Sequence, residues 1–313
     1  MKTIVITGAS DGIGAEMARQ LAARDKAEVA LVLAARNEEQ LQQVAEACTA
    51  LGAQTLVVRT DVSVEAQCHR LVAMALDRFG RIDALINNAG ISAQAQFSEV
   101  TREDLHWYED LMRVNLWGSV WCTHAALPHL HASQGRIVAV SSLAGLVGVP
   151  GRTAYSATKF AMTGFFEALR AELRGAGVSV TTAYPGVVDT RIRYRGFNAK
   201  GVAAGVSGLK EEGAMTVETC ARLILQGRDR RDREVVMTGK GKLGRFLKLI
   251  APGLVEKMAL ALQGSLLVRY GNHAVADAFC ASRLGEHTSG LTFGAMPRGL
   301  DCAAIIARAT PRV

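Results

Sequence analysis

The sequence predicts an α/β protein with a doubly wound parallel sheet of about seven strands and a C-terminal helical extension. Three observations lead to this prediction. Short runs rich in β-branched residues alternate with longer segments of helical periodicity. The alternation continues from residue 3 to about residue 240. A glycine-rich turn follows the first short run, as is common where a parallel strand passes into a helix.

Seven segments have the length and composition of buried strands. They are residues 3–7, 28–34, 55–59, 84–87, 136–141, 179–184 and 234–237. The segments between them predict helices at residues 13–24, 37–50, 64–79, 103–130 and 153–174, the last of which ends at the glycines of RGAG. Because strands that are separated by helices pair in parallel, we expect helices on both faces of the sheet.

The chain divides into three predicted parts. Residues 1–240 are expected to form a single domain, and residues 241–284 a helical extension. Within it, residues 240–268 combine basic and apolar side chains at helical spacing, which suits a lid, an oligomer contact or a helix lying on a membrane surface. Residues 285–313 are rich in Gly, Ala and Arg without clear periodicity, so we expect a poorly ordered tail.

The positive charge is concentrated in one part of the sequence. The formal net charge is +7, and residues 191–248 contain fourteen Lys and Arg against six Asp and Glu, which is +8. No aromatic residues are interleaved in the manner of a nucleic-acid surface, and we expect no nucleic-acid partner. The block is better explained by a solvated face, or by a face that attracts an anionic ligand or membrane.

The cysteines and histidines do not indicate a metal site. The six cysteines are scattered without a CxxC motif, which argues against a disulfide framework or a zinc site and suits a reducing compartment. Three histidines, His124, His129 and His131, lack a nearby carboxylate or cysteine, and Pro128 is expected to interrupt their helix. No signal peptide or membrane-spanning run is evident. We therefore expect a cytoplasmic protein without metal, with membrane association through residues 240–268 as an alternative.

A glycine-rich turn, TGASDGIG, occupies residues 7–14 between the first strand and the first helix. Glycines at three positions allow a sharp turn and close approach of a pyrophosphate, which the helix N-terminus attracts. The candidate dinucleotide-binding residues here are Gly8, Ser10, Asp11, Gly12, Ile13 and Gly14. The spacing is GxxxGxG rather than GxGxxG, and a tight turn without a ligand is the alternative interpretation.

The second and third strands indicate which dinucleotide binds. An NAD site usually has an acidic residue at the end of the second strand to bind the ribose 2′-hydroxyl. Here the strand ends in LAAR, and Arg36 takes that place. A guanidinium binds a 2′-phosphate well, so we predict NADP(H), with NAD(H) less favoured and a surface arginine as the alternative. Asp61, followed by Val62, is placed to accept the adenine amino group or to cap the next helix.

Further short motifs fall at the carboxyl ends of predicted strands. The fourth strand ends in Asn87, Asn88, Ala89 and Gly90, the fifth in a pair of serines that includes Ser142, and the sixth in Pro185, Gly186, Val188 and Thr190. In open α/β sheets ligands bind at this edge. Tyr155 and Lys159 are four residues apart, and this spacing places both on one face of a helix. As an isolated pair they would be a minor surface contact.

Taken together, these motifs resemble the short-chain dehydrogenase/reductase family over residues 3–240. The resemblance rests on TGxxxGIG (Thr7–Gly14), NNAG, Asn115, Ser142, the Tyr155-x-x-x-Lys159 pair and PGxxxT. SSLAG, AYSATKFA and AAR resemble the branch that contains hydroxysteroid dehydrogenases and carbonyl reductases. The resemblance implies a Rossmann-type domain and a homodimer or homotetramer built from the helices at residues 103–130 and 153–174.

The resemblance also implies a role for each catalytic residue. Tyr155 would be the acid in reduction and the base in oxidation, and the positive charge of Lys159 would lower its pKa from about 10. Lys159 would also hold the nicotinamide ribose, and Ser142 would bind the substrate oxygen. Asn115 would position a water behind Lys159. Thr190, with the backbone of Val188, would orient the nicotinamide amide.

The individual residues have simpler alternative explanations. Ser142 by itself could form a turn at a strand end, and Asn115 by itself could bend its helix by bonding to its own backbone. The favoured function is an NADP(H)-dependent oxidoreductase that interconverts a ketone or aldehyde and an alcohol. Its substrate would be a lipophilic small molecule contacted by residues 91–98, 143–152 and the loop after Thr190. The alternative is a catalytically silent NADP-binding regulatory or scaffold protein.

Overall fold

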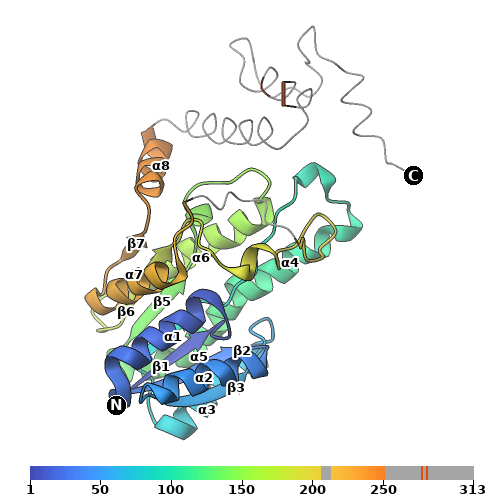
Figure 1. Cartoon of the computed structure of the whole chain (residues 1–313). Helices are drawn as coiled ribbons and strands as arrows, with labels where there is room; N and C mark the ends of the chain where they lie inside the picture. The colour runs from blue at the N-terminus through green and yellow to red at the C-terminus, as the bar shows by residue number, and fades with distance from the viewer. Residues whose placement is uncertain (206–212, 251–275, 278–279, 281–313) are drawn as a thin grey trace. The chain divides into compact units, whose positions relative to one another are not determined.

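The computed structural model describes residues 1–205, 213–250, 276–277 and 280 (Figure 1). Residues 1–242 form one compact unit, and all structural statements below concern this unit unless they say otherwise. The predicted tail at residues 285–313 and most of the predicted extension at 241–284 lie outside the described residues. No helix among the described residues combines the length and the apolar character needed to cross a membrane.

A seven-stranded, fully parallel sheet forms the centre of the unit. Its strands are β1 (Lys2–Thr7), β2 (Val29–Ala35), β3 (Gln54–Arg59), β4 (Ala84–Asn87), β5 (Arg136–Val140), β6 (Ser179–Tyr184) and β7 (Glu234–Val236). The strand order is β3-β2-β1-β4-β5-β6-β7, and every neighbouring pair is parallel. The predicted fold class is confirmed. The order reverses between β1 and β4, and ligands of doubly wound sheets bind at such a switch point.

Helices cover both faces of the sheet, as Figure 1 shows. One apolar cluster joins the sheet to α1 (Gly12–Asp25), α2 (Glu38–Ala50) and α7 (Val217–Arg230). A second cluster joins the opposite face to α3 (Glu65–Phe79), α5 (Gly118–Ser133) and α6 (Thr153–Glu172). Successive residues of β1 point to opposite clusters, Ile4 and Ile6 to the first and Val5 to the second. Because both faces are buried, the strands read as continuous apolar runs.

The single helix predicted at residues 103–130 is divided in the structure. A 3₁₀ turn at Glu103–Leu105 leads into α4 (His106–Met112), a π-helical turn follows at Arg113–Trp117, and α5 completes the segment. A π-helical turn inserts an extra residue into a helix and often marks a functional site, and this one carries Asn115. The expectation that Pro128 interrupts the helix is wrong, because Pro128 lies inside α5.

Helix α7 was not predicted from the sequence. Its last turn contains Arg228 and Arg230, which belong to a run of alternating charges that continues to β7. Arg228 is buried and donates hydrogen bonds to Asp229, and Arg231 ends the helix in a left-handed conformation. Helix α7 packs closely on β7, since a Cβ at Gly227 would lie 2.2 Å from Val235 Cγ2.

Helix α8 (Gly239–Ile250) is the last described helix. It begins inside the compact unit, where the amide of Gly241 donates a hydrogen bond to Thr238 Oγ1 over 3.0 Å. It contains the first residues of the basic, amphipathic stretch at 240–268. The rest of that stretch lies outside the described residues, so its predicted role as a lid, oligomer contact or membrane-surface helix stays a prediction.

Candidate active site

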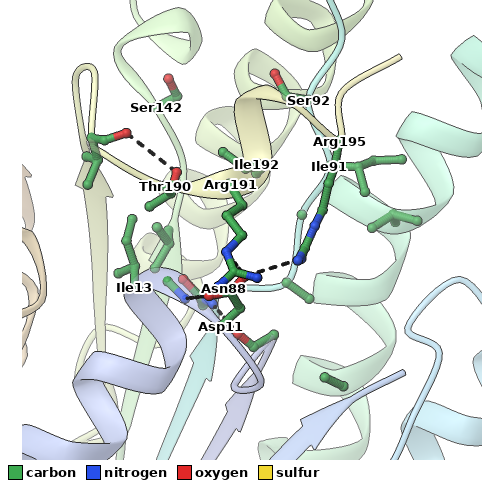
Figure 2. A pocket seen from close by; sticks show the side chains of 18 of the residues that line it. Asp11, Ile13, Asn88, Ile91, Ser92, Ser142, Thr190, Arg191, Ile192 and Arg195 are labelled. Atoms are coloured by element: carbon green, nitrogen blue, oxygen red, sulfur yellow. Dashed lines mark hydrogen bonds and ion pairs between the residues drawn. The ribbon is translucent and has the colours of Figure 1, made fainter. Parts of the chain in front are cut away.

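A cavity of about 650 Å³ opens at the carboxyl edge of the sheet. It is lined by the segments that follow six of the strands, from the glycine turn after β1 to the Pro185 segment after β6. The cavity therefore lies at the switch point between β1 and β4. Figure 2 shows the glycine turn with Asp11 and Ile13 below, and the 3₁₀ turn at Arg191–Arg193, after β6, above it.

Most of the residues singled out from the sequence line this one cavity. They are Gly8, Ser10, Asp11, Gly12, Ile13, Arg36, Asp61, Val62, Asn88, Ala89, Gly90, Ser142, Tyr155, Lys159, Pro185, Gly186, Val188 and Thr190. Three others, Gly14, Asn87 and Asn115, lie behind its wall. The cavity thus brings together motifs that are far apart in the sequence. The three residues behind its wall support the wall by packing and hydrogen bonding.

The glycine turn and the NNAG segment pack against each other without space for side chains. Gly8 has φ +66°, and a Cβ there would lie 2.8 Å from Ala89 Cα. A Cβ at Gly14 would lie 2.2 Å from the carbonyl oxygen of Gly8. The Asn88 side chain donates to the carbonyl oxygens of Thr7 (3.0 Å) and Gly8 (3.1 Å). These contacts hold the start of α1 open toward the cavity, where its free amides can bind a phosphate.

Asp11 has three partners at the base of the cavity. Its carboxylate accepts a hydrogen bond from the Gly12 amide over 2.8 Å and so caps α1. It also forms an ion pair with Arg195 at 3.3 Å and lies 3.9 Å from Arg191. Figure 2 shows both arginines extending from the segment after Thr190 down to Asp11. This segment therefore spans the cavity beside the glycine turn, and its arginines offset the negative charge of Asp11.

The ends of β2 and β3 form the far wall of the cavity. Arg36 is exposed there, and its side chain makes no hydrogen bond or ion pair with the described residues. Asp61 does not cap α3, for which Val64 is the N-cap residue. Instead, its carboxylate accepts hydrogen bonds from the amide (2.9 Å) and hydroxyl (2.7 Å) of Ser63. Asp61 therefore organises a turn, and the alternative of a helix cap is not what the structure contains.

Tyr155 lies in the first turn of α6 and is buried. Burial raises the pKa of its phenol, while the charge of Arg152 and a hydrogen bond with Ser142 act in the opposite direction. Ser142 also accepts a hydrogen bond from the Ala144 amide over 3.2 Å, so the predicted turn at the strand end exists alongside the contact with Tyr155. The Tyr155 and Ser142 hydroxyls are thus neighbours.

Lys159 occupies the next turn of α6, deep in the wall of the cavity. Its Nζ donates to the Val140 carbonyl oxygen over 3.1 Å and lies 5.7 Å from the centroid of the Tyr155 ring. Burial lowers the pKa of Lys159 to about 8. We expected this ammonium to set the acidity of Tyr155. In the structure the pKa of Tyr155 is raised instead, because the cost of desolvation exceeds the opposing effects of the Arg152 charge and of Ser142.

Asn115 is fully buried in the π-helical turn and ties that turn to the segment after β4. Its Oδ1 accepts from the Ile91 amide (2.8 Å), and its Nδ2 donates to the Ile91 carbonyl oxygen (3.0 Å) and to Thr158 Oγ1 (3.0 Å). A Cβ at Gly90 would lie 3.2 Å from Asn115 Oδ1 and 3.7 Å from Lys159 Nζ. The side chain therefore bonds to another segment and not to its own helix, so the alternative of a self-bonded, bent helix is wrong.

Asn87 also acts behind the wall. Its Nδ2 donates to Thr123 Oγ1 on α5 over 2.9 Å, while its Oδ1 is buried without a hydrogen-bond partner among the described residues. The contact ties the end of β4 to α5. Asn87 is thus placed to hold the NNAG segment, and its neighbour Asn88 reaches the cavity itself.

Several polar residues that line the cavity were not singled out from the sequence, among them Ser92 and Arg152. Arg152 comes directly before α6, and its Nη2 donates to Ser92 Oγ over 2.8 Å. Both residues fall within segments that we expected to contact substrate, residues 91–98 and 143–152. Nothing in the sequence distinguishes Arg152 from a surface arginine that starts a helix. The pairing with Ser92 depends on a fold that brings two loops about 60 residues apart into contact.

The fold and the cavity define an α/β dinucleotide-binding protein, and comparison with known proteins gives its family. The sequence pattern of the short chain dehydrogenase family matches residues 2–200. The chain is 37% identical to 11-beta-hydroxysteroid dehydrogenase A of Sesamum indicum over 261 residues, which cover 82% of this chain and 73% of that protein.

Two solved structures share the fold. An alcohol dehydrogenase from the archaeon Thermococcus sibiricus, complexed with 5-hydroxy-NADP, has a TM-score of 0.63 and 28% identity, covering 75% of this chain and 94% of the other. A short chain dehydrogenase/reductase from Burkholderia phymatum, in complex with NAD, has a TM-score of 0.68 and 26% identity, covering 81% and 94%.

The chain belongs to the short-chain dehydrogenase/reductase family of oxidoreductases, and within it to the branch that resembles hydroxysteroid dehydrogenases. The predicted family and branch are confirmed. The two solved neighbours carry a nicotinamide dinucleotide at a site of the same fold, one of the NADP type and one NAD. A nicotinamide cofactor is therefore supported for this chain.

Proposed function

We propose that this protein is an NADP(H)-dependent oxidoreductase that interconverts a lipophilic ketone or aldehyde and the corresponding alcohol by hydride transfer. The observation that carries the proposal is the common cavity. It contains a glycine turn at a helix N-terminus at one end and the Tyr155, Lys159 and Ser142 side chains at the other. When bound, the nicotinamide supplies or accepts the hydride, and the protein aligns the substrate and moves the proton.

The glycine turn fits a pyrophosphate. A Cβ at Gly8 or Gly14 would clash with neighbouring backbone atoms. Only glycine therefore fits at these two positions and leaves the backbone amides of the turn accessible to a phosphate. Asp11 adds a carboxylate close to that position, and Arg195 offsets its charge. Asp61 and Val62 are placed to hold the adenine. Pro185, Gly186, Val188 and Thr190 are placed to hold the nicotinamide amide at the other end of the cavity.

Arg36 favours NADP(H) over NAD(H). It follows β2, lines the cavity, and has no protein partner among the described residues. Its guanidinium is free to bind a ribose 2′-phosphate through charged hydrogen bonds. No carboxylate occupies the position at the end of β2 that would bind a 2′-hydroxyl and repel a phosphate.

Tyr155 is the group that would move the proton. Its hydroxyl lies beside Ser142, which can bind the substrate oxygen, and a substrate oxygen between the two would receive a proton as the hydride reaches the carbon. Lys159 would hold the nicotinamide ribose and exchange protons with Tyr155 on its inner side. Asn115 would fix the Gly90–Ile91 backbone behind Lys159, where the predicted water would lie.

The substrate end of the cavity has apolar walls. Ile91, Val187, Ile192 and Phe197 line it together with Ser92 and Arg152. Apolar walls with a few polar groups are typical of sites for lipophilic ligands. The hydroxysteroid dehydrogenase relative is consistent with such a substrate. A homodimer or homotetramer and a cytoplasmic location, with contact to a membrane surface as the alternative, remain our predictions.

The test is turnover of purified protein with NADPH and with NADH over a panel of aliphatic, aromatic and steroid ketones. We expect at least one lipophilic ketone to accelerate NADPH oxidation, and NADH to be a poorer cofactor. The Tyr155→Phe variant should bind NADPH and lack turnover. Cofactor binding with no acceleration by any carbonyl compound would contradict the proposal and favour a silent NADP-binding protein.

A further inference from the structure

Two cations flank the Tyr155 ring, and the nearer one is not the expected lysine. The Arg152 guanidinium carbon lies 5.0 Å from the ring centroid, whereas Lys159 Nζ lies 5.7 Å away. Arg152 stands directly before α6 and Lys159 one turn into it, so both are fixed relative to Tyr155 by the same helix. Both line the cavity in which the proposed reaction takes place.

The position of Arg152 is held by contacts on both sides. Its Nη2 donates to Ser92 Oγ over 2.8 Å, and Ser92 is itself buried. The backbone before Arg152 is fixed by the Ala95 amide, which donates to the Gly151 carbonyl oxygen over 2.9 Å. The Ser92 carbonyl oxygen in turn accepts from the Phe197 amide over 2.9 Å. A guanidinium so held cannot turn into solvent without breaking these contacts.

No carboxylate neutralises Arg152 within the part of the chain that the structure describes. None of the described ion pairs includes it, and the group that favours its charged form is Tyr155. Its Nε is buried and has no hydrogen-bond partner among the residues that the structure describes. Arg152 is half-buried, so water screens its charge less than that of an exposed arginine. Its charge therefore acts on Tyr155, whose ring centroid lies 5.0 Å from the guanidinium carbon.

The other charged or titratable groups near Tyr155 are exposed, bonded to other residues, or located on other segments of the cavity. On α4, which packs against this end of α6, the Tyr108 hydroxyl hydrogen-bonds to Thr153 Oγ1 over 2.7 Å, while Glu109 and Asp110 are exposed. The remaining charged residues that line the cavity come from the glycine turn, the ends of β2 and β3, and the loop after β6. They are Asp11, Arg36, Asp61, Arg191 and Arg195.

We propose that Arg152 is a positioning residue that makes the Tyr155 hydroxyl a stronger acid by holding a positive charge over its ring. The proposal rests on the proposed function, in which Tyr155 transfers the proton. Arg152 acts in addition to Lys159, to which the Tyr-x-x-x-Lys spacing assigns the same electrostatic role.

The first test is the pH dependence of alcohol oxidation by the NADP-loaded enzyme. Oxidation needs the phenolate as base, so the rate rises with pH through the pKa of Tyr155. In Arg152→Gln this rise should move upward by about one to two pH units, which lowers the rate about tenfold to hundredfold on the acidic side. The rate at high pH should stay close to that of the wild type.

Two further variants separate charge from packing. Arg152→Lys keeps the positive charge, so its profile should lie near that of the wild type. Arg59→Gln removes a positive charge from an exposed residue that does not line the cavity. Its profile should not move. A profile that moves equally in Arg152→Lys and Arg152→Gln, or that does not move in Arg152→Gln, would overturn the proposal.

The second test does not depend on turnover. The chain contains five tyrosines, and the ultraviolet difference spectrum between wild type and Tyr155→Phe isolates the ionisation of Tyr155. The same difference between Arg152→Gln and the Arg152→Gln/Tyr155→Phe double variant should show ionisation at higher pH. If the protein has no turnover but this shift occurs, the proposed function fails and the role of Arg152 stands.

An anion-binding role for Arg152 gives a different result. In that case Arg152→Gln would raise KM for carboxylate-bearing ketones relative to their methyl esters and leave the pH profile and the tyrosinate titration unchanged. A uniform loss of activity at every pH, with an unchanged titration, would identify Arg152 as a structural residue. Either result would contradict the proposal.

Discussion

The two ends of the cavity are built in different ways. The cofactor end is made of backbone, with glycines whose missing side chains let the turn after β1 pack on the NNAG segment. The substrate end depends on polar side chains that are buried, Tyr155 and Lys159, or half-buried, Ser142 and Arg152. The difference teaches that the cofactor end is specified by shape and the substrate end by electrostatics. Substitutions should therefore affect the two ends through different measurable quantities.

The largest effect is expected at the substrate end from Tyr155→Phe. General acid–base catalysis contributes about 10²- to 10⁴-fold to rate, and kcat for carbonyl reduction should fall by that factor with NADPH affinity retained. Tyr108→Phe is the matched control, because that hydroxyl bonds to Thr153 and does not line the cavity. A Tyr155→Phe enzyme that keeps more than a tenth of wild-type kcat would show that another group moves the proton.

The next largest effect concerns the outer part of the cofactor end. Arg36→Ala removes the free guanidinium at the end of β2. Charged hydrogen bonds are worth about 1.5–3 kcal/mol, so kcat/KM for NADPH should fall about 10- to 150-fold while that for NADH changes little. Steady-state kinetics with both cofactors measure the ratio.

Arg59 offers a control for this substitution. It ends β3, is exposed, and does not line the cavity, so Arg59→Ala should leave the NADPH/NADH ratio unchanged. Equal losses with both cofactors in Arg36→Ala would contradict a 2′-phosphate site and leave the cofactor preference to other residues.

A third effect should appear in stability at the inner part of the cofactor end. Gly14→Ala places a Cβ 2.2 Å from the Gly8 carbonyl oxygen, so backbone must shift. Overpacking of this kind costs about 1–3 kcal/mol in the free energy of unfolding, measured by urea denaturation. Gly148→Ala, where a Cβ would meet nothing within 4 Å, should stay within about 0.5 kcal/mol of wild type. Equal stability of the two variants would show that the turn can relax.

The smallest expected effect is a pH dependence of stability that arises from Lys159 at the substrate end. Burial lowers the pKa of Lys159 to about 8, below its value of about 10.4 in the unfolded chain. The unfolded chain therefore binds more protons between these values, and stability contributed by this group rises as pH increases through that range. Below pH 8 its destabilising effect is fully present.

The measurement is urea denaturation of wild type and Lys159→Met between pH 7.5 and about 9.5. The free energy of unfolding of wild type should gain about 1–2 kcal/mol on the variant over that range. The buried Tyr155 and cysteines, whose raised pKa values lower stability at still higher pH, are present in both proteins. A difference between wild type and variant that does not change with pH would mean that Lys159 is not desolvated.

The sequence predicted the sheet well because its strands are buried on both faces. Each predicted strand coincides with an observed one to within one residue at either end, since continuous apolar runs bounded by turns leave few alternatives. Helix α7 was not predicted because Gly227 and the charged residues of its last turn are typical of a turn. In the structure the glycine is required by the close packing of α7 on β7. The π-helical turn depends on the contact between Asn115 and Ile91, which is a tertiary interaction.

The site, like the fold, has features that the sequence predicts and features that depend on tertiary contacts. Glycine-rich and small polar motifs identify the cofactor end from the sequence, because their spacing reflects backbone geometry. The acidity of Tyr155 could not be predicted from the Tyr-x-x-x-Lys spacing, because burial and Arg152 act on it as well. Ser92 and Arg152 meet only through the folded loops after β4 and β5. The electrostatic properties of the site could be described only from the structure, because they depend on burial and on contacts between distant segments.

The central claim is that one cavity brings a nicotinamide and the Tyr155 hydroxyl to the same substrate carbonyl. The most direct measurement is reduction of an accepted ketone with NADPH that carries deuterium on one face of the nicotinamide C4, followed by mass spectrometry of the alcohol. We predict one deuterium on the carbinol carbon from one of the two labelled faces only, and labelled alcohol formed about 10²- to 10⁴-fold more slowly by Tyr155→Phe. Alcohol formed without deuterium from either face would contradict direct hydride transfer in this cavity.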